Sequence, residues 1–253
     1  MRNFFWYITL PFRILYKFYF AGIFLVTSII FFPPAAILVR NVNNVHLVYK
    51  IKRVWASSIL ILSGIIVVLK GKQNIPKEPA VICANHTSYL DILIIFYMMK
   101  KTTVFLGKAE ILNWPIIGAF FKNMNIPVER GNKMKAAQSL QLTKKALEKG
   151  FNVAIFPEGK IPDYHTPKVY PFKFGAFNLA ITKEAPIMPV TYETSWKLLR
   201  DHHNLLEVGM PGIARTIIHP AIHTTNMTVK QEAERIKDLT KEIIEEPLKK
   251  YYS

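Results

Sequence analysis

Cysteine and acidic residues are both scarce in this chain. The 253 residues contain one cysteine, Cys83, which excludes an internal disulfide, and nothing in the sequence indicates an oxidising compartment. Because Cys83 lies in the apolar run 80–84, we interpret it as a buried structural thiol rather than a nucleophile. Only 17 aspartates and glutamates stand against 33 lysines and arginines, so the formal net charge is +16. This surplus predicts an anionic partner: nucleic acid, an acidic lipid surface or an acidic carrier protein.

Patterns that bind metals or nucleic acids are also missing from the sequence. No second histidine stands three or four residues from His86, and the other six histidines form no ligand pattern, so we predict no metal site. Nucleic-acid binding would explain the charge but not the apolar runs described next, and the chain carries no recognisable motif for it. We therefore expect no nucleic-acid partner.

Two long uncharged runs, residues 18–39 and 54–69, lie near the amino terminus. The first is long enough to cross a bilayer, which takes about 20 apolar residues, but we expect Pro33-Pro34 to break or kink its helix. It ends in no small-residue cleavage site, so we do not expect a secretory signal peptide. The second run is shorter than a usual span. The basic residues that flank the runs are Arg13, Lys17, Arg40, Lys50, Lys52, Arg53, Lys70 and Lys72.

These runs fit either a pair of spanning helices or a re-entrant pair within one leaflet. Both arrangements return the chain to its starting side. The flanking lysines and the aromatic residues at 4–7 fit a membrane interface better than a buried soluble hairpin, which is the remaining alternative. We predict a membrane-associated helical hairpin in residues 1–70 and one α/β domain in residues 71–253, facing the cytoplasm.

After residue 70 the chain alternates short β-like runs with helical stretches, which is typical of an α/β fold. A helix is expected over residues 133–149, with Asn132 as its N-cap and Gly150 as its stop, and another after Thr228. We predict a mixed central sheet flanked by helices and preceded by a membrane-embedded two-helix motif. The expected strands are residues 80–84, 103–107, 126–129, 152–156, 187–192 and 214–219.

A histidine and an aspartate five residues apart, His86 and Asp91, follow the apolar run 80–84. On one continuous helix this spacing would turn the two side chains about 140° apart. They can meet only if His86 lies in the loop after the strand and Asp91 in the first helical turn. An imidazole held there by a carboxylate can take a proton from a hydroxyl group. The alternative is structural, because Ser88-x-x-Asp91 is close to a capping box that would only start a helix.

A second polar cluster, Pro157-Glu158-Gly159, follows another apolar strand. The glycine permits a tight turn close to a ligand, although Pro-Glu-Gly alone is more often only a turn. Lys108 and Arg130 follow two further strands, where basic groups suit an anionic headgroup or the phosphates of a thioester carrier.

In this order the segments resemble the motif blocks of the glycerolipid acyltransferases, the family of bacterial lysophosphatidate acyltransferases. The first block is Asn85-His86-Thr87-Ser88-Tyr89-Leu90-Asp91, and the second runs from Lys108 to Arg130. The third is Phe156-Pro157-Glu158-Gly159, and the fourth is the proline-centred strand around 185–190. None of the four would suffice alone, but their order from residue 80 to about 192 is specific.

The resemblance implies transfer of a fatty acyl group from a thioester donor, on acyl carrier protein or coenzyme A, to the free hydroxyl of a lysophospholipid. In that reaction His86 is the general base and Asp91 orients it, with no acyl-enzyme and no bound cofactor. Glu158 and Gly159 help to hold the acceptor, while Lys108 and Arg130 meet its headgroup. The expected acceptor is 1-acyl-glycerol-3-phosphate, which gives phosphatidic acid.

One departure from the family pattern concerns the residues after Gly159. The family usually continues with Thr-Arg and assigns that arginine to phosphate, whereas this chain has Lys160 and Ile161. Either Lys160 binds the phosphate, or the acceptor is a non-phosphate lysolipid such as a lyso-amino-acid lipid. A non-catalytic protein that binds anionic membranes is the alternative of another class. The sequence leaves open the acyl chain length, the donor, the acylated position and the oligomeric state.

Overall fold

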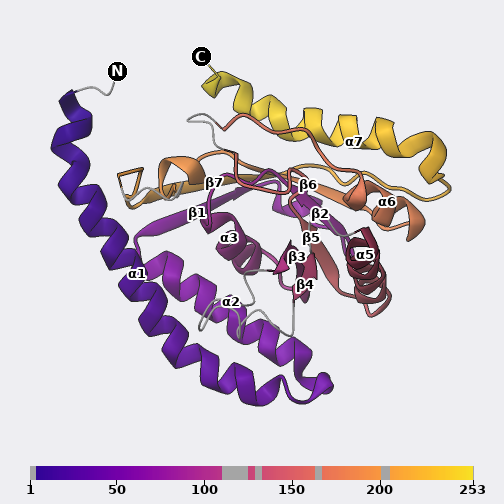
Figure 1. The fold of residues 1–253 in the computed structure, drawn as a ribbon, viewed down its shortest axis with the longest axis horizontal. Coiled ribbons are helices and arrows are strands. Elements are labelled where there is room, and N and C mark those ends of the chain that lie inside the picture. Colours follow the sequence, from indigo (N-terminus) through magenta and orange to yellow (C-terminus); the bar gives the residue numbers. More distant parts are fainter. Residues whose placement is uncertain (1–3, 110–124, 129–132, 163–166, 201–205, 253) are drawn as a thin grey trace.

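A computed structural model describes residues 4–109, 125–128, 133–162, 167–200 and 206–252. It begins with a long helix, α1 (Phe4–Leu38), and a short turn, η1 (Val42–Asn44), leads into α2 (Val45–Leu62). The two helices pack side by side as a hairpin, and α1 curves along the outside of the molecule (Figure 1). The Tyr16 and Tyr19 hydroxyls join α1 to the end of α2, donating to the Ser63 and Leu62 carbonyls at 2.8 Å each.

Helix α1 carries an exposed apolar face. Among the described residues, Ile8–Leu38 is the one helical stretch long and apolar enough to cross a membrane by length and composition. The helix runs unbroken through Pro33-Pro34, contrary to the break considered from the sequence. These prolines lie within the last two turns, so the loss of their N–H groups affects only the helix end. The exposed large side chains are Ile8, Phe12, Leu15, Phe18, Tyr19, Leu25, Val26, Ile29, Ile30 and Ile37.

The second apolar run divides between a helix and a strand. Helix α2 ends at Leu62, Gly64 turns the chain at a φ of 70°, and Ile65–Lys70 form strand β1. Assigning the whole run to the membrane hairpin was therefore wrong for its last residues, and the boundary expected at residue 70 falls after a strand of the sheet. The β-branched sequence Ile65-Ile66-Val67-Val68 explains the strand, because such side chains fit a pleated surface.

One seven-stranded sheet forms the body, in the order β1-β7-β6-β2-β5-β3-β4. Among the paired strands that the structure describes, β6–β7 is the one antiparallel pair, so the sheet is mixed, as predicted. The six strands expected from the sequence are present, with ends shifted by at most two residues. They are β2 (Val81–Ala84), β3 (Thr103–Lys108), β4 (Asn125–Val128), β5 (Asn152–Ile155), β6 (Ile187–Tyr192) and β7 (Gly212–Ile218).

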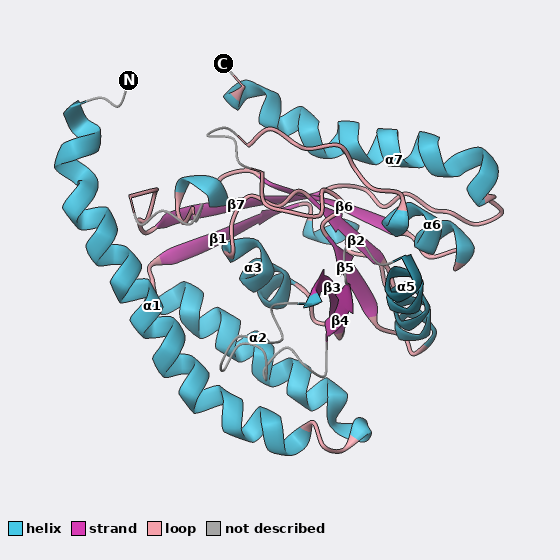
Figure 2. Cartoon of the chain, in the orientation of Figure 1, coloured by secondary structure: helices cyan, strands magenta, loops and turns pink. Residues whose placement is uncertain are grey.

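Helices cover both faces of this sheet and enclose two apolar cores (Figure 2). The hairpin and α3 (Leu90–Met98) lie on one face. The other face carries α5 (Lys133–Glu148), α6 (Gly175–Thr182), α7 (Val229–Glu245) and η5 (Glu246–Tyr251). The remaining short turns are η2 (Lys72–Asn74) and η4 (Ser195–Lys197).

The predicted helix ends and the predicted burial of Cys83 are confirmed only in part by the structure. Gly150 ends α5 at a φ of 81°, as predicted, and Cys83 is buried in the core. Thr228 precedes α7, but its hydroxyl contacts the Gln231 side chain and makes no backbone cap. Asn132 lies outside the described residues. Strands β2, β5 and β6 are parallel neighbours, so their carboxyl ends meet at the same edge of the sheet.

Candidate active site

The loop between β2 and α3 is fastened to the neighbouring strand β6 by Asn85. The buried Asn85 amide donates to the Tyr192 carbonyl oxygen at 3.1 Å and accepts from the Tyr192 amide at 2.7 Å. This pair of bonds extends the contact between the strands beyond the end of β2. The following residue, His86, is thereby held at the carboxyl edge of the sheet. Sequence reasoning quoted Asn85 within a motif but gave it no role.

His86 and Asp91 are in contact, as the predicted loop-to-helix geometry requires. The His86 Nδ1 atom lies 3.0 Å from Asp91 Oδ2, and the Asp91 side chain is fully buried. The same oxygen accepts the backbone amides of Thr87 at 2.7 Å and Ser88 at 2.9 Å. The catalytic and the structural interpretation of Asp91 are therefore compatible, because one carboxylate orients the ring and also fixes the loop before α3.

This contact determines the tautomer of His86. A carboxylate oxygen can only accept, so Nδ1 carries the proton and Nε2 keeps its lone pair. The ring is also stacked on Phe156, with centroids 4.0 Å apart and planes 15° apart. With 14 % of its side chain exposed, the imidazole is restrained on two sides but still reachable. A neutral imidazole in this state can act as a general base.

Glu158 braces the two loops that build the site. It is 5 % exposed, and its two carboxylate oxygens accept the backbone amides of His86 and Tyr170, each at 2.8 Å. Burial raises the pKa of Glu158 to about 8, although the hydrogen bonds from Tyr170 and His86 oppose that shift. The described contacts of Glu158 are therefore with backbone, and its predicted contact with the acceptor stays a prediction.

An open cavity of about 370 Å³ lies beside this brace, and it carries two lysines. Gly159 has a φ of 80°, which favours glycine, and the Lys173 side chain lies over it, so that a Cβ there would lie 2.9 Å from Lys173 Nζ. The Lys160 ammonium lies 4.9 Å from the centre of the Tyr170 ring. Two positive side chains in one small cavity provide a place for an anionic group. The lining residues are Glu158, Gly159, Lys160, Tyr170, Pro171 and Lys173.

The remaining predicted site residues are described only in part. Lys108 ends strand β3, but its side chain lies outside the described part of the structure, as does the whole of Arg130. Their predicted contact with the headgroup therefore stays a prediction. Among the described residues, no three His, Cys, Asp or Glu side chains are grouped so that they could hold a metal ion.

Ser88, which the sequence suggested only as a helix cap, and Arg200, which it did not single out, also lie at the site. The Ser88 hydroxyl donates to the Leu199 carbonyl oxygen at 2.5 Å, which ties the motif loop to the segment after β6. The adjacent Arg200 is 5 % exposed and, with Thr87 and Trp196, borders a small hollow next to His86. Its guanidinium lies 5.8 Å from the Trp196 ring. No signal in the sequence joins residue 200 to residue 87, because only the tertiary fold brings them together.

Known proteins resemble this chain in sequence over the region that contains the site. The chain is 31% identical over 158 residues to the 1-acyl-sn-glycerol-3-phosphate acyltransferase of Haemophilus influenzae, which covers 60% of this chain and 62% of that protein. It is 30% identical over 187 residues to a chloroplastic 1-acyl-sn-glycerol-3-phosphate acyltransferase of Arabidopsis thaliana, covering 71% and 49%. The chain thus spans about half to three-fifths of the length of these relatives.

The fold also matches a solved structure, and a family model covers the site. The crystal structure of the 1-acyl-sn-glycerophosphate acyltransferase PlsC from Thermotoga maritima superposes with a TM-score of 0.74 over 97% of both chains, at 19% identity. The family model described as Acyltransferase matches residues 66–193, just over half of the chain. That stretch contains His86, Asp91 and Glu158. The chain therefore belongs to the acyltransferase family.

Proposed function

We propose that the protein is an O-acyltransferase that moves a fatty acyl group from a thioester to the free hydroxyl of a lysophospholipid. The observation that carries this proposal is the 3.0 Å contact between His86 Nδ1 and the buried Asp91 carboxylate at the carboxyl edge of the sheet. That contact leaves Nε2 free to accept a proton from the acceptor.

The residues support a direct transfer. As His86 Nε2 takes the hydroxyl proton, the acceptor oxygen attacks the thioester carbonyl and forms a tetrahedral oxyanion. Collapse of this intermediate breaks the carbon–sulfur bond, and the imidazolium returns its proton to the leaving thiolate. The buried Asp91 carboxylate stabilises the imidazolium while it exists. The products are the O-acyl ester and the free thiol, so no acyl-enzyme forms.

The acceptor that fits best is 1-acyl-glycerol-3-phosphate, which would give phosphatidic acid. Lys160 and Lys173 line the cavity beside Glu158, and both can meet a phosphate. The relatives in Haemophilus and Arabidopsis are named for this acceptor. Ile161 supports the rival acceptor, a lyso-amino-acid lipid, because an uncharged side chain stands where the family usually has arginine.

The donor and the location complete the proposal. An acyl group on acyl carrier protein or coenzyme A is the co-substrate, and no bound cofactor takes part. The exposed apolar face of α1 would place the protein at the cell inner membrane, with the catalytic domain facing the cytoplasm. The lipid acceptor then reaches His86 without leaving the membrane.

A panel of acceptors tests the proposed reaction. Purified protein would be offered palmitoyl groups on acyl carrier protein and on coenzyme A, each with 1-acyl-glycerol-3-phosphate or a lyso-ornithine lipid, and products would be identified by mass spectrometry. We expect phosphatidic acid as the main product. Acylation of the lyso-ornithine lipid alone would show that the acceptor is a lyso-amino-acid lipid instead. Absence of any acylated lipid with either donor would leave only a membrane-binding protein.

A further inference from the structure

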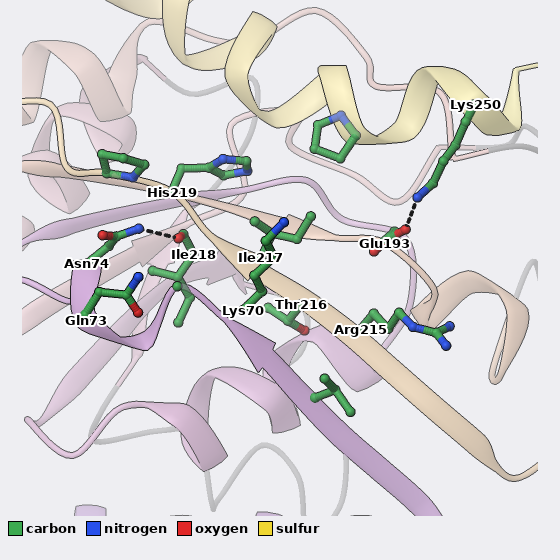
Figure 3. Close-up of a pocket in the computed structure, with 14 residues that line it drawn as sticks. Lys70, Gln73, Asn74, Glu193, Arg215, Thr216, Ile217, Ile218, His219 and Lys250 are labelled. Carbon is green, nitrogen blue, oxygen red and sulfur yellow. Dashed lines mark hydrogen bonds and ion pairs between the residues drawn. The ribbon is translucent and has the colours of Figure 1, made fainter.

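A second cavity, of about 620 Å³, lies outside the active site (Figure 3). It is formed between the edge strand β1, its neighbour β7 and the carboxyl-terminal turn η5. It shares no lining residue with the cavity beside Glu158. The proposed acyl transfer therefore gives this second cavity no role.

The floor of this cavity is apolar, with basic side chains at the same level. Along the outer face of β1, Val68 is followed by Lys70, and the register places Val68 opposite Arg215 and Lys70 opposite Ile217. Ile66 is 63% exposed and Val68 is 45% exposed, which is unusual for branched apolar side chains on an edge strand. The face thus combines apolar and cationic groups.

The positive charges of the cavity are not balanced by its acidic side chains. Its one carboxylate, Glu193, already pairs with Lys250 and accepts the Tyr251 hydroxyl at 3.1 Å. Within the described part of the chain, neither Lys70 nor Arg215 has a carboxylate partner. The pKa of His219 is lowered, mainly because the ring is buried and to a smaller extent because the positive Lys70 ammonium lies nearby.

The basic groups are spread along the cavity. Arg215, Lys250 and Glu193 lie toward one end of the cavity. His219 and Asn74 lie toward the other end, and Lys70 lies between the two groups (Figure 3). Val68 pairs with Arg215, and Lys70 lies two residues further along β1, so the two long cationic side chains leave neighbouring strands. Such a pair can hold a phosphate group by charge-assisted hydrogen bonds. The volume lies in the range of small-ligand sites.

The neighbouring elements indicate which molecule brings that phosphate. Ile61 and Leu62, 71% and 54% exposed, end α2 immediately before β1. The hydrogen bonds of Tyr16 and Tyr19 fix the apolar helix α1 at this same point. Across the Gly64 turn the chain continues into β1, where the exposed apolar side chains of Ile66 and Val68 precede Lys70 on the same face of the strand.

We propose that this cavity binds the phosphate of an anionic membrane phospholipid, with Arg215 and Lys70 as its phosphate ligands and Val68 and Ile217 beneath its apolar part. Charge complementarity and the exposed apolar side chains of Ile66 and Val68 on β1 favour a lipid over a soluble phosphate. The site is separate from the one that holds His86. Failure of the proposed acyl transfer would therefore leave this proposal standing.

Calorimetry with a soluble short-chain lipid tests the site directly. Dihexanoyl phosphatidylglycerol, which is neither acceptor nor product of the proposed reaction, would be titrated into the full chain in non-ionic detergent. We expect the double variant Lys70→Gln, Arg215→Gln to bind it at least about tenfold more weakly, because two charge-assisted contacts are lost. The matched control is Lys149→Gln, Lys230→Gln, which removes the same charge from exposed lysines elsewhere and should bind like the wild type.

Each other outcome has a defined meaning. Equal lipid binding by the wild type and the double variant would contradict the proposal that Lys70 and Arg215 bind the lipid phosphate. Inorganic phosphate that binds the wild type as tightly as the lipid, and displaces it, would replace the lipid by a free-phosphate ligand. If the double variant does not fold, lipid binding by Val68→Glu tests the site instead, because this substitution places a carboxylate opposite Arg215 at an exposed position. We expect that variant to lose lipid binding as well, and unchanged binding would contradict the proposal.

Discussion

At the scale of single residues, the site depends on carboxylates that serve backbone and side chain together. Asp91 Oδ2 accepts the His86 ring and two backbone amides, and Glu158 holds the amides of His86 and Tyr170. A change at either carboxylate therefore alters the backbone that positions the imidazole as well as the charge of the site.

The first prediction concerns Asp91→Asn. The amide oxygen can still accept backbone N–H groups, but it no longer carries the negative charge that stabilises the imidazolium. We expect kcat for acyl transfer to fall by about 10²–10⁴-fold while the fold is retained. Steady-state kinetics, together with thermal unfolding, would check this. A variant that keeps wild-type kcat would show that Asp91 serves only to fix the loop.

Glu158 gives a prediction about pH. Burial raises its pKa from 4.5 to about 8, so between these values the folded state holds a proton that the unfolded state has lost. The Glu158 contribution to the free energy of unfolding should therefore decrease as pH rises from about 5 to about 8, by a few kcal/mol at most. Glu158→Gln should remove that part of the pH dependence in denaturant unfolding. An unchanged dependence in the variant would assign it to other groups.

Tyr192 provides a prediction about stability. Its ring is fully buried, and its hydroxyl makes no hydrogen bond within the described structure. Removing an unsatisfied buried hydroxyl relieves its desolvation, so Tyr192→Phe should change the free energy of unfolding by less than about 1 kcal/mol in either direction. A loss of more than about 2 kcal/mol in urea unfolding would reveal a bound water that bridges this hydroxyl to a neighbour.

At the scale of elements, the site depends on how β2, β5 and β6 are joined. Asn85→Ala would remove both bonds to the Tyr192 backbone and leave a buried N–H and C=O without partners. We expect a loss of about 2–4 kcal/mol in the free energy of unfolding, and a lower kcat because the His86 loop loosens. Asn178→Ala, on α6 and outside the loop between β2 and α3, is a suitable comparison and should keep its kcat. Equal kcat values for the two variants would remove the positioning role of Asn85.

Much of this element-scale arrangement could be predicted from sequence. Six strands are visible as short apolar runs, and the contact of His86 with Asp91 follows from their spacing once a strand-to-helix turn is assumed. Strand β1 was not predicted, because the uncharged run 54–69 was treated as one segment, although the Ser63-Gly64 turn divides it. The strand order, the role of Asn85 and the approach of Arg200 to Thr87 depend on contacts between distant residues, which no local pattern encodes.

At the scale of the whole molecule, the charge of +16 is combined with one long apolar helix. We expect an acidic acyl carrier protein to be attracted by this charge, so the rate with a carrier-bound donor should fall as salt screens the attraction, over about 0.05–0.5 M NaCl. Initial rates at a fixed low donor concentration would measure this. A rate that does not change with salt would remove the electrostatic part of the account.

The central claim is that His86 is the base that activates the acceptor hydroxyl. The most direct test is the rate of palmitoyl transfer to 1-acyl-glycerol-3-phosphate by His86→Ala, measured beside His223→Ala, which changes an exposed histidine far from the motif in sequence. The account predicts a loss of at least about 10²–10⁴-fold for His86→Ala and a wild-type rate for His223→Ala. Wild-type transfer by a folded His86→Ala protein would contradict it.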